Sequence, residues 1–168
     1  GIDPAAIASV EEVGDGNLNL VFIVHDAAGN GIVLKQALPY VRLVGPEWPM
    51  TPERARHEHD ALVTHAVNAP DLVPIVYGYD ADRYIIAMED LSDHRVWRGA
   101  LCDGEQAEGA ATALGEFVAS YAFATSVLGL PEDAHKAAAV RSSNPDLCKI
   151  TEDLVFTEPV DDIGRNSV

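Results

Sequence analysis

Residues 14–21 read Gly-Asp-Gly-Asn-Leu-Asn-Leu-Val, and residues 32–35 read Ile-Val-Leu-Lys. The first stretch places two glycines between apolar segments, at residues 10–13 and 18–24, that have the composition of strands. A loop rich in Asp, Asn and Gly follows at residues 26–31, and the second stretch predicts a third strand that ends in a lysine. Strand, glycine turn, strand, loop and strand in this order predict an antiparallel meander.

The glycine turn matches the pattern Gly-x-Gly-x-x-Gly-x-Val of protein-kinase phosphate loops, except that Asn19 stands at the third glycine. Asparagine tolerates left-handed backbone geometry better than most residues, so the change is mild. Glycines also let backbone N–H groups approach phosphate oxygens. Taken alone, the motif fits an ordinary hairpin turn better than a phosphate site.

Lys35 makes the pattern more specific. It follows Gly14 by 21 residues on the third predicted strand, where kinases place a lysine that contacts nucleotide phosphates. A helix predicted from Thr51 and Pro52 to about Val67 carries Glu58, the candidate partner for this lysine. The alternatives are a strand-end lysine that reaches water and an exposed helix acid.

The remaining pattern predicts an α+β fold in two parts. Strands at residues 73–79 and 83–88 complete a five-stranded sheet, and only helices follow, at about 104–129 and 144–154. We place a nucleotide-binding lobe at residues 1–88, a hinge at 89–93 and a partial helical lobe at 94–168.

Composition excludes several functional classes. The 168 residues include 11 basic and 27 acidic side chains, a net charge of −16, whereas nucleic-acid binding needs clustered basic charge. The least acidic stretch that could form an anion site holds Lys35, Arg42, Arg54 and Arg56. No apolar run is long enough for a membrane span, and residues 1–4 show no signal peptide. Two distant cysteines, Cys102 and Cys148, fit a reducing cytoplasm.

Several blocks resemble the 5-methylthioribose kinases, in the right order over nearly the whole chain. These blocks are residues 12–22, Lys35–Arg42 with Gly45–Pro49, Arg54–Glu58, Leu72–Pro74, Met88–Ser92, Asn144–Cys148 and Leu154–Pro159. The resemblance implies a protein-kinase-like fold, with an antiparallel five-stranded N-lobe and one helix followed by the first helices of a helical C-lobe. It also implies transfer of the ATP γ-phosphate to the 1-hydroxyl of 5-methylthioribose in methionine salvage.

The resemblance implies ATP and Mg²⁺ as cofactors and a small-molecule substrate. In two-lobed kinases the hinge backbone binds adenine, which makes the Glu89 carbonyl and the Leu91 N–H the candidates here. The residues expected to bind ATP are Gly14, Asp15, Gly16, Asn17, Asn19, Lys35, Glu58, Met88, Glu89, Asp90 and Leu91.

The chain also departs from that family. Members continue into a His-Gly-Asp catalytic loop and an Asp-x-Glu metal motif, and neither stands in a suitable context here. Asp103-Gly104-Glu105 matches the Asp-x-Glu pattern, but no catalytic loop precedes it, so we interpret the match as coincidental. We expect an amino-terminal portion that is inactive alone and lacks catalytic and metal residues. Its exposed apolar residues, such as Leu114, Phe117 and Tyr121, favour association, for example as a homodimer.

Two other interpretations remain open from the residues. One is another small-molecule kinase of the aminoglycoside or choline kinase type. The other is a non-catalytic, pseudokinase-like module that binds a nucleotide without transferring phosphate.

Overall fold

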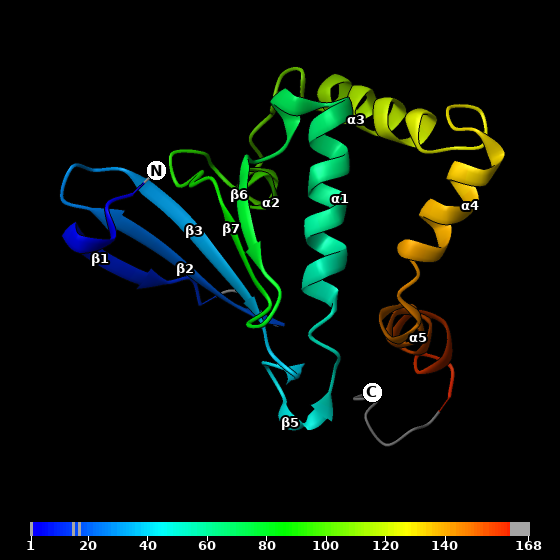
Figure 1. The fold of residues 1–168 in the computed structure, drawn as a ribbon, viewed down its shortest axis with the longest axis horizontal. Coiled ribbons are helices and arrows are strands. Elements are labelled where there is room, and N and C mark those ends of the chain that lie inside the picture. Colours follow the sequence, from blue (N-terminus) through cyan, green and yellow to red (C-terminus); the bar gives the residue numbers. More distant parts are fainter. Residues whose placement is uncertain (1, 15, 17, 162–168) are drawn as a thin grey trace.

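The computed structural model describes residues 2–14, 16 and 18–161, and it contains a five-stranded sheet followed by helices (Figure 1). The strands are β1 (Ile7–Glu12), β2 (Asn19–Asp26), β3 (Gly31–Ala37), β6 (Val76–Asp80) and β7 (Ile85–Met88). They are ordered β1-β2-β3-β7-β6, and every neighbouring pair is antiparallel. The sheet and the helices after it confirm the mixed α+β class predicted from the sequence.

The loop between β2 and β3 is held by one carboxylate. Asp26 is buried and accepts hydrogen bonds from the backbone N–H groups of Ala28 and Asn30, both at 2.9 Å, and from that of Asp3 at 3.1 Å. The Asn30 side chain donates a further bond at 2.8 Å. These donors stabilise the ionised form, the Asn30 amide most of all, and lower the pKa of Asp26 to about 2.

β3 lies at the centre of the sheet, because it pairs with β2 on one side and β7 on the other. Val21 and Ile86 are the residues opposite Lys35 on these two strands. Opposite residues in an antiparallel ladder project from the same face. Lys35 therefore shares a sheet face with Val21, Val33 and Ile86.

Helix α1 (Arg54–Asn68) covers one end of that face. Ala55 of the helix packs with Ala37 and the fully buried Ile86, and Tyr79 and Met88 lie at the edge of this cluster. The sequence predicted that this helix starts from Thr51 and Pro52, with Thr51 as its cap, which is two residues too early. The helix begins after Glu53, whose side chain makes no capping bond, while Thr51 Oγ1 accepts the Glu53 N–H at 3.3 Å.

A small ribbon between the sheet and α1 was not predicted. It pairs β4 (Tyr40–Val41) with β5 (Gly45–Pro49), two segments for which the sequence predicted no strand. Gly45 adopts a φ of 96°, in the left-handed region that favours glycine. A backbone bond of 3.1 Å from Met50 to the Pro39 carbonyl closes the ribbon.

After the hinge come α2 (Trp97–Cys102), α3 (Ala110–Ala124), α4 (Glu132–Arg141) and α5 (Pro145–Glu152), followed by a π-helical turn at Asp153–Thr157. The single helix predicted over 104–129 is wrong. Gly104 and Gly109 have left-handed φ values of 74° and 80° and precede α3, which ends at Ala124. The last predicted helix is confirmed, with Asn144 as its cap.

The helices after the hinge touch the rest of the molecule mainly through α3. In Figure 1, α3 crosses one end of α1, and α4 and α5 run on the side of α1 away from the sheet. Phe117 and Tyr121 pack their rings against His65 of α1, with centroids 5.1 and 4.6 Å from it. The expectation that these two residues are exposed is therefore wrong, whereas Leu114 is exposed as expected. None of the helices in the described ranges has the length and apolar character needed to cross a bilayer.

Candidate functional site

A cavity of about 620 Å³ lies between the first strands and the hinge. Its apolar walls come from the sheet face that Lys35 shares, and its other side is the hinge backbone. The lining residues include Val13, Gly14, Val21, Ile23, Val33, Pro74, Met88, Glu89, Asp90, Leu91, Ser92, His94 and Val96. The cavity thus joins Gly14, at the start of the glycine turn, to Glu89, Asp90, Leu91 and Ser92 of the predicted hinge. The walls Val21, Ile23 and Val33 were not predicted as site residues, although strand alternation from Lys35 points to them.

Lys35 lies at the boundary between this cavity and helix α1. Val33, two residues before it, lines the cavity, while Ile86, opposite it, packs under the helix. Lys35 Nζ donates to Glu58 Oε1 at 2.6 Å, and the two side chains are 28% and 34% exposed. The ion pair anticipated from the sequence is therefore present. Lys35 thus stands next to Val21 and Val33, which line the cavity, and its side chain is partly open to solvent.

Arg54 is a buried cation with a role that the sequence did not reveal. Its side chain is almost fully enclosed, and all five of its N–H groups have neutral oxygen acceptors. These acceptors are the carbonyls of Leu18, Leu38 and Thr51, at 2.7–2.9 Å, and Asn19 Oδ1, which accepts two bonds at 2.9 and 3.2 Å. Burial lowers the pKa of Arg54, against the opposing charge of Glu58. Arg54 therefore ties the end of the glycine turn to the start of α1.

The glycine turn itself is held by a second arginine. Arg42 Nη1 donates to the Gly16 carbonyl at 3.0 Å, and its Nη2 pairs with Glu12. A Cβ atom at Gly16 would lie 2.8 Å from the Asn19 carbonyl oxygen, so this position requires glycine. Gly14 meets no such restriction. Asp15 and Asn17, the other predicted loop residues, lie outside the described residues.

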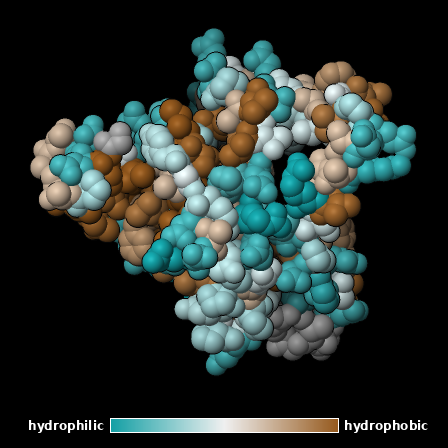
Figure 2. Space-filling view, in the orientation of Figure 1, coloured by the Kyte–Doolittle hydropathy of each residue, from teal (hydrophilic) through white to brown (hydrophobic). Residues whose placement is uncertain are grey.

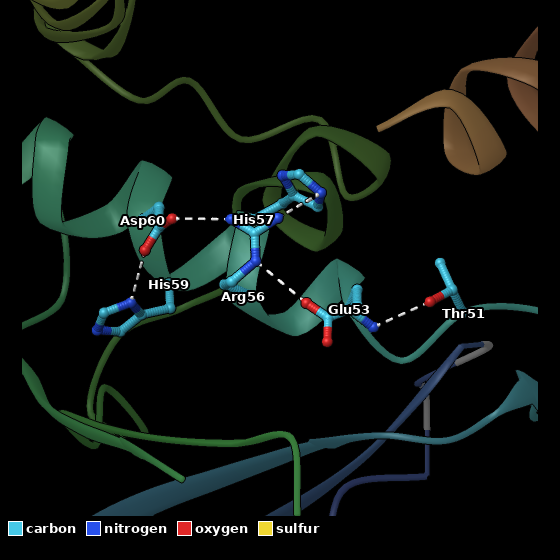
Figure 3. A network of polar contacts seen from close by, with 6 residues as sticks. All are labelled: Thr51, Glu53, Arg56, His57, His59 and Asp60. Carbon is cyan, nitrogen blue, oxygen red and sulfur yellow. Dashed lines mark hydrogen bonds and ion pairs between the residues drawn. The ribbon is translucent and has the colours of Figure 1, made fainter. Parts of the chain in front are cut away.

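Arg56 belongs to a separate polar network on α1 (Figure 3), in which His59 stacks on Tyr79 of β6 with ring centroids 5.0 Å apart. It pairs with Glu53 at 3.1 Å and with Asp60 at 3.3 Å, and Asp60 also contacts His59. Lys35, Arg42, Arg54 and Arg56, the four cations of the candidate anion site, therefore do not converge on one site. Arg54 and Arg42 organise the loop, Arg56 lies on the helix surface, and Lys35 is the one beside the cavity.

The hinge presents two backbone groups to the cavity region. The Glu89 N–H donates to the Ile75 carbonyl at 2.8 Å, and the Glu89 carboxylate accepts the Ile75 N–H at 3.0 Å. The Leu91 carbonyl accepts from His94 N at 2.9 Å. Within the described part of the chain, the Glu89 carbonyl and the Leu91 N–H take part in no hydrogen bond. These are the two groups that the sequence assigned to a nucleobase.

Asp103 and Glu105, the Asp-x-Glu pair noted in the sequence, lie beside one arginine. Both carboxylates pair with Arg95, Glu105 at 2.5 Å. Over the described ranges, no group of three or more His, Cys, Asp or Glu side chains is placed to hold a metal ion. The binding of Mg²⁺ therefore stays a prediction, and we assign it no residue.

Comparison with known proteins gives one consistent result. No family model matches the chain. Over 166 residues it is 48% identical to a methylthioribose kinase of Yersinia pseudotuberculosis (strain IP 31758), and equally to one of Yersinia enterocolitica. It is 48% identical over 165 residues to a methylthioribose kinase of Cronobacter sakazakii. Each match covers 98% of this chain but only 41–42% of the relative, so the chain spans about two fifths of the length of these proteins.

Proposed function

We propose, from this similarity to methylthioribose kinases, that the chain is the ATP-binding portion of an enzyme that phosphorylates 5-methylthioribose on its 1-hydroxyl. The observation that carries the proposal is the Lys35–Glu58 ion pair at the edge of the hinge cavity. Phosphoryl transfer depends on positioning and on charge stabilisation, and a strand lysine held by a helix glutamate supplies both in kinases. We further propose that residues 1–88 form a kinase-like N-lobe.

In this proposal the cavity holds the nucleoside. The side chains of Val21, Val33 and Met88 offer apolar surfaces for a planar base, and the Glu89 carbonyl and Leu91 N–H meet its polar edge. Pockets of this kind combine apolar walls with a few well-placed polar groups.

The phosphates then lie toward the glycine turn and Lys35. Arg54 and Arg42 hold the ends of that turn, while Glu58 keeps the lysine ammonium oriented toward the phosphates. A fixed positive charge at this point stabilises the charge that develops on the transferred group.

The proposed chemistry needs more than these residues. A kinase also requires a group that positions the hydroxyl nucleophile and ligands for the metal that bridges the phosphates. The described residues offer no such metal cluster. We therefore propose that these groups belong to the part of the relatives that this chain does not span, and that the chain alone binds ATP without turning it over.

The test is ADP release from Mg-ATP by a protein that contains this chain and the remaining length of its relatives. We expect turnover with 5-methylthioribose, far less with choline or an aminoglycoside, and none from the 168-residue chain alone. Preference for another acceptor would support the small-molecule kinase alternative. ATP binding without transfer to any acceptor would support the pseudokinase alternative.

A further inference from the structure

Asp90, in the middle of the hinge, is joined to the far end of the β2–β3 hairpin. Its Oδ2 contacts Nε2 of His25, the next-to-last residue of β2, at 2.9 Å. Its Oδ1 accepts the Ser92 N–H at 2.9 Å and also contacts the Ser92 hydroxyl. The Asp90 side chain is 12% exposed. Hydrogen bonds from Ser92 lower the pKa of Asp90, with a smaller contribution from His25, so the carboxylate is ionised at neutral pH.

Gly31 makes room for this carboxylate. It stands opposite His25 in the ladder between β2 and β3. A Cβ atom at Gly31 would lie 2.3 Å from Asp90 Oδ2 and 3.0 Å from Asp90 Cβ, so any larger residue would displace the aspartate. The hairpin end therefore supplies both a partner for the hinge carboxylate and the space it occupies.

The position of Asp90 in the chain gives this contact its consequence. The Glu89 carbonyl belongs to the peptide unit before the Asp90 Cα, and the Leu91 N–H belongs to the unit after it. Peptide units are planar, so the two backbone dihedral angles of Asp90 alone set how these two groups are oriented relative to each other. Fixing the Asp90 side chain at both carboxylate oxygens restrains those angles.

We propose that His25, Gly31 and Asp90 form a clamp that fixes the hinge backbone for recognition of adenine. His25 and Asp90 are then positioning residues, which act through the Glu89 carbonyl and the Leu91 N–H. This inference rests on the proposed nucleotide-binding function and adds the reason why the hinge prefers one base.

The chemistry of the two bases explains the expected preference. Adenine presents an amino donor beside a ring-nitrogen acceptor, which matches a carbonyl acceptor and an N–H donor held in fixed orientation. Guanine carries a carbonyl acceptor where adenine carries its amino donor. A rigid pair of hinge groups therefore discriminates between the bases, because a mismatched base leaves polar groups unpaired. A loosened hinge discriminates less.

The test is calorimetric titration of the 168-residue chain with ADP, GDP and inorganic tripolyphosphate. We compare wild type with Asp90→Asn, His25→Leu, Gly31→Ala and the double variant of His25 and Asp90, with Asp82→Asn in the exposed β6–β7 turn as the control. We expect each clamp variant to lose about 10-fold in ADP affinity, the size of one charge-assisted hydrogen bond. We expect the affinity for tripolyphosphate to stay unchanged and the ratio of ADP affinity to GDP affinity to fall. The double variant should lose no more ADP affinity than Asp90→Asn.

Two results overturn the clamp. One is an unchanged ADP:GDP ratio in Asp90→Asn, with folding confirmed by circular dichroism. The other is an equal loss for all three ligands, which indicates a structural role only.

Amide hydrogen exchange separates the clamp from the proposed function. If wild type binds no nucleotide, the proposed function fails. In that case the clamp is judged from the free chain alone. It stands if Asp90→Asn and His25→Leu speed amide exchange at residues 89–92 while Asp82→Asn does not, and it fails otherwise.

Discussion

The residues before the hinge and the helices after it differ in how they bury apolar surface. Of the described residues, the buried hydrophobic ones before the hinge are Val24, Ala37, Val41, Met50, Ala55, Ala69 and Ile86, whereas Ala100 is the only one after it. Leu128, by contrast, is 80% exposed. Figure 2 shows hydrophobic residues on the surface over the helices as well as over the sheet.

This difference indicates where the stability of the chain lies. Burial of apolar surface is the main favourable contribution to folding. The sheet and α1 achieve it among themselves, and they carry the cavity, Lys35 and the hinge. The candidate site therefore stands on the region that is best packed, and the helices α2–α5 depend on contacts such as those of Phe117 and Tyr121 with His65.

The largest expected effect concerns Lys35. In the longer protein, Lys35→Ala should lower kcat for phosphoryl transfer by about 100- to 1,000-fold, because fixed charges at the transferred group contribute about 3–4 kcal/mol. Lys136→Ala on α4, which removes an exposed lysine of the other region, should leave the rate unchanged. Glu58→Gln should act like Lys35→Ala but more weakly, and the double variant should be non-additive. Steady-state kinetics of all four variants check this, and an unchanged kcat in Lys35→Ala removes the lysine from the mechanism.

The next effect compares two apolar truncations. Ile86→Ala leaves a cavity under α1 and should lower the free energy of unfolding by about 3 kcal/mol. Leu128→Ala, at an exposed position, should change it by less than about 0.5 kcal/mol. Urea denaturation of the two variants measures both values. Equal losses would contradict the view that stability is concentrated before the hinge.

A smaller effect is expected for Arg54. Arg54→Lys keeps the charge but replaces five N–H donors by three, so several neutral acceptors lose their hydrogen-bond donor. We expect the free energy of unfolding to fall by about 2 kcal/mol. Arg141→Lys at the end of α4 is the matched exchange in the other region and should be neutral. If Arg54→Lys is equally neutral in urea denaturation, Arg54 does not hold the glycine turn to α1.

The smallest effect depends on pH. Because the folded state lowers the pKa of Asp26 to about 2 from 3.8, the folded form is favoured above pH 4. This contribution declines as the pH falls from 4 toward 2. Asp26→Asn removes that part of the pH dependence. Thermal denaturation between pH 6 and pH 2 should give a flatter profile for the variant, and parallel profiles would show that Asp26 contributes nothing to acid sensitivity.

The sequence predicted those features whose signals are local. Apolar and β-branched runs between turn signals indicated all five strands of the sheet, and the order of Gly14, Lys35 and Glu58, compared with the kinase pattern, anticipated the ion pair. The role of Arg54 could not be predicted, because its acceptors come from three separate segments. The helix predicted over 104–129 was too long at both ends. Its apolar spacing begins only at Leu114, after the left-handed Gly104 and Gly109, and Leu128 continues the spacing beyond the end of α3 at Ala124. The unpredicted β4–β5 ribbon lies among prolines, which are poor strand formers.

Amide hydrogen exchange of the 168-residue chain, with and without Mg-ATP, tests the central claim most directly. We expect added protection in the glycine turn, around Lys35 and at residues 89–91, and no change in α4 and α5. Leu91→Pro, which removes the N–H donor, should abolish the protection at the hinge, while Leu91→Ala should retain it. Protection confined to residues 97–161, or none at saturating ATP, would contradict the assignment of the nucleotide site to the sheet and the hinge.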